Sequence, residues 1–198
     1  TVQNSMINAE NSGTTIRIAI AIAALSGGNT TLTGDDSLRK RPMQPILDAL
    51  ETMGVKTEAD NGKPPINING KIQGKEIMIK GNISSQFISA LLIIAPRLPD
   101  GLIINIQEEL VSKPYVDLTI AIMKKFGVMI ETEMNYKRYV VSHQIYKPTT
   151  FLIPSDFSNL ALLLAANVLL GDGLRIEINL GDMPQGDEAI VDILEKLG

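Results

Sequence analysis

The sequence predicts an α/β (α+β) fold made of a few copies of one βαβ-type unit that close around a shared core. The main evidence is an internal repeat: a turn of small or hydroxyl residues, an apolar helix, a glycine-bounded strand, a second helix and a closing glycine. In chain order, the turns begin at Asn11, Asn82 and Ser155, and the closing glycines are Gly54, Gly127 and Gly198. Both landmarks therefore recur every 71 to 73 residues. This period exceeds that of a solenoid repeat, which favours a closed domain over an open array.

The helices are of two kinds, which predicts how they are layered. The first helices cover residues 16–25, 87–94 and 160–170, and the second ones cover residues 42–53, 114–126 and 187–197. The first helices are apolar nearly all round, as helices buried on every side are. The second helices have one polar face; in 42–53, Ile46 and Leu50 lie opposite Asp48. Pro42 and Pro114 suit a first helical turn. We expect the first helices inside and the second ones covering them.

Strands are predicted between the helices, where β-branched residues are bounded by Gly, Pro or Asn. They cover residues 30–33, 55–58, 66–69, 76–79, 102–107, 128–133, 137–142, 151–153 and 174–178. The segment 61–65 predicts a surface loop, and Asn135-Tyr136 a hairpin turn. The polar passage 146–150 is the expected boundary between the second and third repeats.

Composition excludes several classes of function. The 198 residues are 44% hydrophobic, enough for a sizeable core. A net charge of −4 and the lack of a basic patch interleaved with aromatic residues argue against nucleic-acid binding. The absence of cysteine excludes a disulfide framework, a thiol nucleophile and a cysteine-ligated metal. The single histidine, His143, lies in a strand-like stretch, where we expect a structural role, and we expect no metal site.

The sequence predicts no association with a membrane. Its apolar runs are far shorter than the roughly 20 residues that a bilayer requires, and no secretory signal is present. We therefore expect a cytoplasmic protein. Because the chain opens at Thr1 without an initiator methionine, we also expect it to be part of a longer one.

The turns of the repeat point to anion binding. A helix that begins after Gly, Ser or Thr exposes unpaired backbone N–H groups at its positive end, and small side chains let an anion approach them. Several such helix starts at one end of a pseudo-symmetric domain would bind a phosphorylated or carboxylated metabolite. Capping alone explains any one turn taken singly, because Ser, Thr, Asp and Asn cap helices generally.

Short motifs in these turns carry a resemblance to a known family. They are Asn-Ser-Gly-Thr-Thr-Ile-Arg at 11–17, Leu-Thr-Gly-Asp at 32–35, Arg-Pro at 41–42, Ser-Ser-Gln-Phe at 84–87, Ser-Lys-Pro-Tyr at 112–115, Ser-Asp-Phe-Ser at 155–158 and Gln-Gly-Asp at 185–187. In this order and spacing the chain resembles the 5-enolpyruvylshikimate-3-phosphate synthases over its whole length. The motifs at 84–87 and 112–115 favour this family over its relative that acts on UDP-N-acetylglucosamine, which usually carries a loop cysteine.

The resemblance implies a two-domain enzyme of βαβαββ units with buried helices, the inside-out α/β barrel of the enolpyruvyl transferases. It implies transfer of the enolpyruvyl group of phosphoenolpyruvate to the 5-hydroxyl of shikimate 3-phosphate, in chorismate biosynthesis, without a cofactor. Residues 1–148 would be two units of the shikimate-3-phosphate-binding domain, and 149–198 the first unit of the partner domain. The family's catalytic residues match nothing in this chain, so we expect the chain alone to be inactive. The whole protein is expected to be monomeric, with self-association of this fragment an open alternative.

Matched motif by motif, the resemblance implies two binding subsites. Shikimate 3-phosphate would be bound by Ser84, Ser85, Gln86, Ser112 and Tyr115. Phosphoenolpyruvate would be bound by Asn11, Gly13, Thr14, Arg41 and Gln86. Arg41 would offer a bidentate fork to a phosphate or carboxylate, and Gln86 would contact both ligands. Arg17 is given a supporting role without ligand contact.

Two positions depart from the family pattern, and other interpretations remain open. Glu10 stands where many relatives have Gly, and Ile18 where many have Pro; a carboxylate beside an anion-binding turn is expected to weaken phosphoenolpyruvate binding. Arg41 has the alternative of belonging to a solvated basic run. The alternatives for Tyr115 and Ser112 are a core side chain and a helix cap. Two other functions also stay open: a UDP-N-acetylglucosamine enolpyruvyl transferase-like enzyme, or a non-catalytic anion-binding scaffold.

Overall fold

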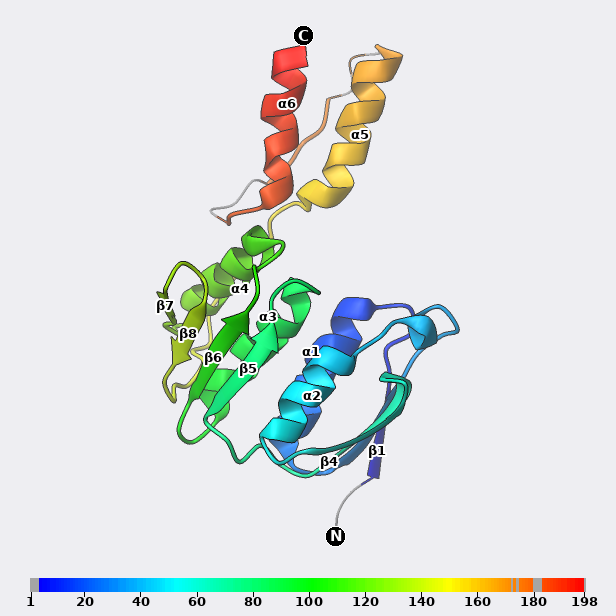
Figure 1. The fold of residues 1–198 in the computed structure, drawn as a ribbon. Coiled ribbons are helices and arrows are strands. Elements are labelled where there is room, and N and C mark those ends of the chain that lie inside the picture. Colours follow the sequence, from blue (N-terminus) through cyan, green and yellow to red (C-terminus); the bar gives the residue numbers. More distant parts are fainter. Residues whose placement is uncertain (1–3, 172, 174, 180–182, 198) are drawn as a thin grey trace. The chain divides into compact units, whose positions relative to one another are not determined.

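The computed structural model describes residues 4–171, 173, 175–179 and 183–197, and its chain forms two compact units that divide between Lys147 and Pro148. Among the described residues, the larger unit holds the strands together with helices α1 to α4, and the smaller unit holds α5 and α6 (Figure 1). Among the described residues, every helix falls short of the length and apolar character needed to cross a bilayer.

The first half of the larger unit is a four-stranded sheet with two helices. Its elements are β1 (Asn4–Asn8), α1 (Gly13–Ser26), β2 (Asn29–Thr33), the 3₁₀ turn η1 (Leu38–Lys40), α2 (Gln44–Thr52), β3 (Lys56–Asp60) and β4 (Lys63–Asn69). The strand order is β1-β2-β4-β3, with β1 and β2 parallel and the other neighbours antiparallel. Helix α1 is the crossover between the two parallel strands, as such a connection requires.

The second half repeats this topology. Its elements are β5 (Glu76–Lys80), α3 (Ser85–Ile94), η2 (Ala95–Arg97), β6 (Leu102–Gln107), α4 (Lys113–Lys125), β7 (Glu131–Glu133) and β8 (Arg138–Val141). The strand order is β5-β6-β8-β7, again with the first two strands parallel. The predicted repeat is thereby confirmed for these two copies, and each copy is a βαβαββ unit.

The predicted layering is confirmed in the larger unit. Helices α1 and α3, the first helices of the two copies, pack against each other, and their Ile20 and Leu91 side chains are completely buried. Helix α2 buries Ile46 and Leu50 and leaves Asp48 exposed. The sequence therefore places the core between the first helices and the sheets, because only these helices are apolar enough to be enclosed.

The strands of this unit differ from the prediction at two places. β1 was not expected, since Asn4–Asn8 has few β-branched residues; it is a strand because it pairs in parallel with β2. The expected loop 61–65 overlaps β4, which begins at Lys63. Proline lacks a backbone N–H, and Pro64 and Pro65 are tolerated here because they lie beyond the pairing with β2, where the register against β3 also shifts. The expected turn at Asn135 is confirmed between β7 and β8.

The smaller unit consists of α5 (Phe157–Leu170), a 3₁₀ turn η3 (Gly186–Glu188) and α6 (Ala189–Leu197). The strand expected over 151–153 is wrong, and the described part of 174–178 is irregular, with Leu174 and the closing Gly198 outside the described residues. The chain before α5 meets the 175–179 segment at Ser155, whose N–H donates to the Asn179 carbonyl at 2.8 Å. These described residues form no ladder, so the apolar stretches there are not strands.

The burial expected for the third first-type helix is not found within the smaller unit taken by itself. In α5 only Phe157 and Leu160 are buried, whereas Leu162 is 73% exposed and Leu169 is 85% exposed. Within the smaller unit, α5 is packed against η3 and α6.

Candidate anion-binding site

A serine hydroxyl caps the helix after each of the turns that precede α1 and α3. The Ser12 hydroxyl accepts a hydrogen bond from the Thr15 N–H at 3.1 Å, and the Ser84 hydroxyl accepts one from the Gln86 N–H at 3.3 Å. Both serines have extended backbones, as N-cap residues do. Because β1 and β5 each end directly before such a turn, both helix starts lie at the carboxyl ends of parallel strands, the usual place for a ligand in α/β sheets.

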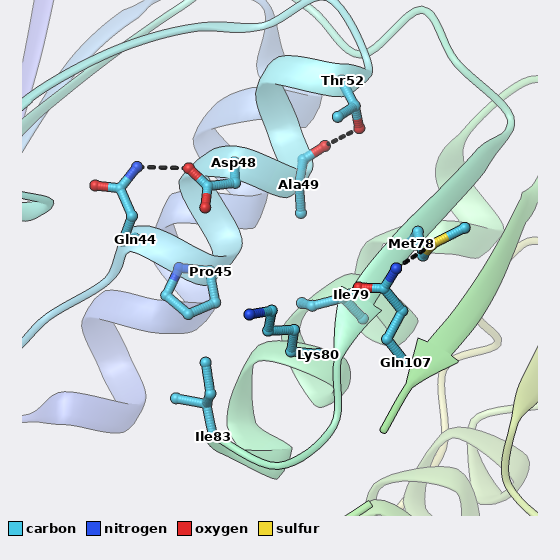
Figure 2. Close-up of a pocket in the computed structure, with 10 residues that line it drawn as sticks. All are labelled: Gln44, Pro45, Asp48, Ala49, Thr52, Met78, Ile79, Lys80, Ile83 and Gln107. Carbon is cyan, nitrogen blue, oxygen red and sulfur yellow. Dashed lines mark hydrogen bonds between the residues drawn. The ribbon is translucent and has the colours of Figure 1, made fainter. Parts of the chain in front are cut away.

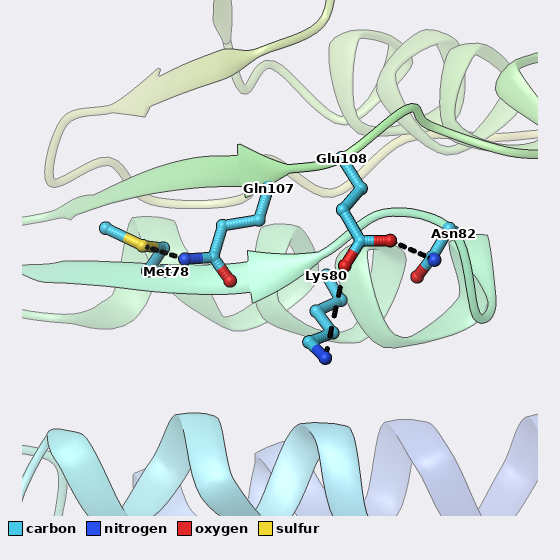
Figure 3. A network of polar contacts seen from close by, with 5 residues as sticks. All are labelled: Met78, Lys80, Asn82, Gln107 and Glu108. Atoms are coloured by element: carbon cyan, nitrogen blue, oxygen red, sulfur yellow. Dashed lines mark hydrogen bonds and ion pairs between the residues drawn. The ribbon is translucent and has the colours of Figure 1, made fainter.

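An asparagine and an acid brace each turn from the neighbouring strand end. Asn11 Nδ2 donates to Asp35 Oδ2 at 2.7 Å, and Asn82 Nδ2 donates to the Glu108 carboxylate (Figure 3). Asn82 follows Asn11 by 71 residues and Glu108 follows Asp35 by 73, so the two braces are equivalent in the repeat. In the second copy, Lys80 lies 3.9 Å from Glu108.

The Asp35 carboxylate is held in its charged form. Hydrogen bonds from the Leu38 N–H and then from the Asn11 side chain lower the pKa of Asp35, and the charge of Arg41 lowers it further. The carboxylate is exposed, so its role is to fix the turn between β2 and η1, which leads to Arg41.

The Gln86 side chain connects the two turns. Its Nε2 donates to Thr14 Oγ1 at 3.1 Å, and its Oε1 accepts from Arg17 Nη1 at 2.5 Å. Gln86 and Thr14 are 72 residues apart and hold the same position in the two copies. The packing of α1 against α3 therefore brings equivalent helix starts face to face.

Two guanidinium groups converge on the first residue of α1. A Cβ atom on Gly13 would lie 2.8 Å from Arg41 Nη1 and 2.9 Å from Arg17 Nη1. Arg17 is half-buried, with its guanidinium 5.2 Å from the centre of the Phe87 ring, and Arg41 is exposed. Burial and then the nearby charge of Arg41 lower the pKa of Arg17. Two like charges beside the positive end of a helix form a place that attracts anions.

The remaining predicted residues lie at the starts of α3 and α4. Ser85 is the first residue of α3 and is buried, and Ser112 precedes α4 with a left-handed backbone (φ 56°) and no capping hydrogen bond from its side chain. The Val111 N–H donates to the Gly81 carbonyl at 3.1 Å, which ties the α4 start to the turn that leads into α3. Tyr115, in the first turn of α4, is 48% exposed.

The structure thus brings Gly13, Thr14, Arg41 and Gln86 together, while Asn11 has its amide engaged by Asp35. The sequence analysis missed both the Asn11–Asp35 hydrogen bond and the hydrogen bond that Arg17 donates to Gln86. The first could have been found, because an asparagine and an acid recur at equivalent places in both copies of the repeat. Nothing in the sequence indicates the second. Of the two departures, Glu10 is turned toward Asn8, whose Nδ2 donates to it at 3.2 Å, and Ile18 lies partly buried against the core.

A cavity of about 330 Å³ lies between α2 and the β5–β6 edge (Figure 2). It is lined by Gln44, Pro45, Asp48, Ala49, Thr52, Met78, Ile79, Lys80, Ile83 and Gln107, and none of these is a predicted site residue. Over the described part of the chain, no cluster of three His, Cys, Asp or Glu side chains is suited to hold a metal ion.

Known proteins resemble this chain in sequence and in fold. Residues 1–198 match the family described as EPSP synthase (3-phosphoshikimate 1-carboxyvinyltransferase). The 3-phosphoshikimate 1-carboxyvinyltransferase of Nitrosopumilus maritimus (strain SCM1) is 59% identical over 192 residues, which cover 97% of this chain and 46% of that protein. The corresponding protein of Methanocorpusculum labreanum is 44% identical over 197 residues, covering 99% of this chain and 46% of that protein.

Among solved structures, an EPSP synthase from Acinetobacter baumannii superposes with a TM-score of 0.68 at 27% identity. The match covers 83% of this chain and 36% of that one. The chain spans about half the length of the curated relatives it matches. A sequence match over all 198 residues, joined to a shared fold, shows that the chain belongs to the EPSP synthase family.

Proposed function

We propose that the whole protein transfers the enolpyruvyl group of phosphoenolpyruvate to the 5-hydroxyl of shikimate 3-phosphate. Family membership supports this reaction. The observation that carries it in this chain is the convergence of Gly13, Arg41 and Gln86 at the facing starts of α1 and α3. Such a site suits a pair of small anionic substrates that must be held next to each other.

For phosphoenolpyruvate, the proposed subsite is the start of α1. Gly13 leaves room for two guanidinium groups beside the first turn, Arg41 offers two parallel N–H donors, and the Gln86 amide contributes a further donor. Phosphoenolpyruvate carries a phosphate and a carboxylate, and both match these donors. Thr14 holds the Gln86 amide in place, and Asn11 fixes the turn through Asp35.

For shikimate 3-phosphate, the proposed subsite is the start of α3 together with the start of α4. The hydroxyls of Ser84 and Ser85 and the first backbone N–H groups of α3 would bind the phosphate. Ser112, whose hydroxyl caps nothing in α4, would donate to the same ligand, and Tyr115 would lie against its ring. Gln86 stands between the two subsites. We assign no catalytic residue within these 198 residues.

Ligand binding by this chain tests the proposal. We expect shikimate 3-phosphate to bind with a dissociation constant on the order of millimolar, measured by calorimetry or NMR shifts, because only part of its contacts is supplied here. The double variant Ser85→Ala/Gln86→Ala should lose this binding. The control Ser89→Ala, one turn further along α3, should keep it. Equal binding by the double variant and the unmodified chain would contradict the proposed subsite.

The other functions predict different outcomes. A UDP-N-acetylglucosamine transferase-like protein would bind the nucleotide sugar and ignore shikimate 3-phosphate. A non-catalytic scaffold would bind both anions, yet the full-length protein would release no phosphate from the two substrates. We expect phosphate release by the full-length protein and no binding of the nucleotide sugar.

A further inference from the structure

We propose that Arg17 is a positioning residue that determines which end of the Gln86 amide faces the bound anion. The inference rests on the proposed function, because it concerns the same phosphoenolpyruvate subsite. It adds a residue that acts on the ligand through another side chain.

The argument begins with the two ends of an amide. A glutamine side chain has an acceptor oxygen and a donor nitrogen of nearly equal size, so that shape alone does not choose between its two orientations. Arg17 Nη1 lies 2.5 Å from Gln86 Oε1. A guanidinium group has donors only, so the end of Gln86 next to Arg17 must be the oxygen. The flipped amide would place two donors against each other.

The fixed oxygen determines what the other end offers. Gln86 Nε2 faces the α1 start, where one of its hydrogens bonds Thr14 Oγ1 at 3.1 Å. Its second hydrogen is left as a donor at this helix start, where an anion needs donors. In the opposite orientation the amide would present an oxygen, which repels a phosphate or carboxylate. Arg17 thereby converts a side chain with two possible orientations into a dedicated donor.

The surroundings of Arg17 hold it in this role. Its guanidinium lies 5.2 Å from the Phe87 ring centre, and its Nε is buried without a hydrogen-bond partner in the part of the chain that the structure describes. The group is therefore fixed by packing and by Gln86. Burial and Arg41 lower its pKa, but an arginine side chain stays protonated at neutral pH.

The second copy of the repeat provides a natural comparison. Ser89 follows Arg17 by 72 residues and holds its position in α3. Its hydroxyl pairs with Thr119 of α4 at 2.8 Å. Of the two equivalent helix positions, the one in α1 therefore holds an arginine and the one in α3 holds a serine. Ser89 is thus a control position equivalent to Arg17.

The first test needs no ligand. In the unmodified chain, NMR should show the Gln86 side-chain amide as rigid and slow to exchange with water. Arg17→Met keeps the apolar stem and removes the donors, and it should make this amide clearly more mobile, because only the bond to Thr14 then holds it. Arg17→Lys, which keeps a donor and the charge, should retain part of the order, and Ser89→Ala should leave the amide unchanged.

The second test is a double-mutant cycle on phosphoenolpyruvate affinity. Arg17→Met should weaken binding about tenfold, but only about threefold when Gln86 is already Ala, because the effect of the Arg17 charge remains while its action through Gln86 is lost. An effect of the same size in both backgrounds would mean that Arg17 acts by its charge alone, and would overturn the proposal.

A third variant keeps the proposal testable if Arg17→Met does not fold. Gln86→Glu offers Arg17 an even better acceptor but presents no donor to the ligand. It should fold as stably as the unmodified chain and lose phosphoenolpyruvate affinity at least about tenfold; retained affinity would contradict the role of the donor.

The proposed function and the positioning role of Arg17 are contradicted by different results. An unmodified chain that binds no phosphoenolpyruvate contradicts the proposed function, whereas a Gln86 amide unaffected by Arg17→Met contradicts the positioning role.

Discussion

At the scale of single residues, the tightest point of the candidate site is Gly13. Its backbone is helical, so its conformation would accept any L-residue, and the constraint on this position is one of space. Two guanidinium groups fill the volume that a Cβ atom would need. The arrangement of the two arginines therefore requires a residue without a Cβ atom at position 13.

Gly13→Ala should separate stability from binding. Alanine is the better helix former by up to about 1 kcal/mol, so thermal unfolding should stay unchanged or move slightly upward. The ends of Arg17 and Arg41 must shift, because the new carbon would lie within 3 Å of both. We expect phosphoenolpyruvate affinity, measured by calorimetry, to fall about tenfold. The control Gly74→Ala, whose Cβ would lie 3.2 Å from Met53 Cγ, should not change affinity. Unchanged affinity in Gly13→Ala would disprove the crowding argument.

The brace at Asp35 predicts a dependence on pH. A carboxyl whose pKa is lowered by folding stabilises the fold above its ordinary pKa of roughly 4, and this contribution disappears as the pH falls through the lower pKa of the folded state. Asn11→Ala removes one of the hydrogen bonds responsible, so the pKa of Asp35 should rise toward its ordinary value in an NMR titration. The loss of unfolding free energy between pH 7 and pH 3 should become smaller. Asn105→Ala, which removes an exposed hydrogen bond to Glu76, should leave the Asp35 titration unaltered.

The sequence is better suited to proposing residues for the site than to predicting their contacts. Gly13, Arg41 and Gln86 are proposed from the family resemblance of the turn motifs, whose small residues, charge and helix starts are local properties. The hydrogen bond that Arg17 donates to Gln86 joins residues 69 positions apart, so it depends on how α1 packs against α3. Local pattern holds no information about such a packing.

At the scale of elements, capping explains why helices were predicted well and strands less so. The Ser84 cap starts α3 two residues before the predicted range, and the Asp156 side chain accepts from the Ser158 N–H at 2.9 Å at the start of α5. These are local interactions. A strand such as β1 exists only because a partner strand lies beside it, so its five residues gave no signal by themselves.

The start of α5 depends on one side chain from beyond the helix. Gln185 Oε1 accepts from the Phe157 N–H at 3.1 Å, and Gln185 Nε2 donates to the Ser155 carbonyl at 2.8 Å. Gln185→Ala should therefore destabilise the smaller unit by about 1–3 kcal/mol, because two partly buried backbone groups lose their partners. Hydrogen exchange at the Phe157 amide is the measurement.

Gln185→Glu is the graded version of the same test. It keeps the acceptor and loses the donor, so it should give an intermediate acceleration of exchange. The exposed α6 substitution Glu195→Ala should give none. Equal protection of the Phe157 amide in all three variants would show that Gln185 does not hold the helix.

At the scale of the whole molecule, the larger unit encloses its first helices and the smaller one does not. Leu162 and Leu169 are seven residues apart, so they lie on the same side of α5, and both are largely exposed. A contiguous apolar helix face in water is a surface that associates. The sequence predicted the apolar character of this helix but not its exposure, because hydropathy measures what a helix can bury and not what covers it.

We expect the 198-residue chain to self-associate in a concentration-dependent manner through this face. Sedimentation velocity should show larger species that disappear in Leu162→Lys/Leu169→Lys. The paired control Met6→Lys/Met129→Lys changes two other exposed apolar side chains and should leave association as it is. A chain that stays monomeric over the whole accessible concentration range would contradict this expectation.

The bond between Thr14 and Gln86 also has a kinetic consequence. It joins positions 72 residues apart, whereas each parallel strand pair is closed by a single helix, so the two copies can form from local contacts before their helix starts meet. We therefore expect the two helix starts to pair after the rate-limiting step of folding. Phosphoenolpyruvate should consequently slow unfolding in stopped-flow experiments and leave the refolding rate unchanged, and faster refolding with ligand would place the pairing of the turns in the transition state.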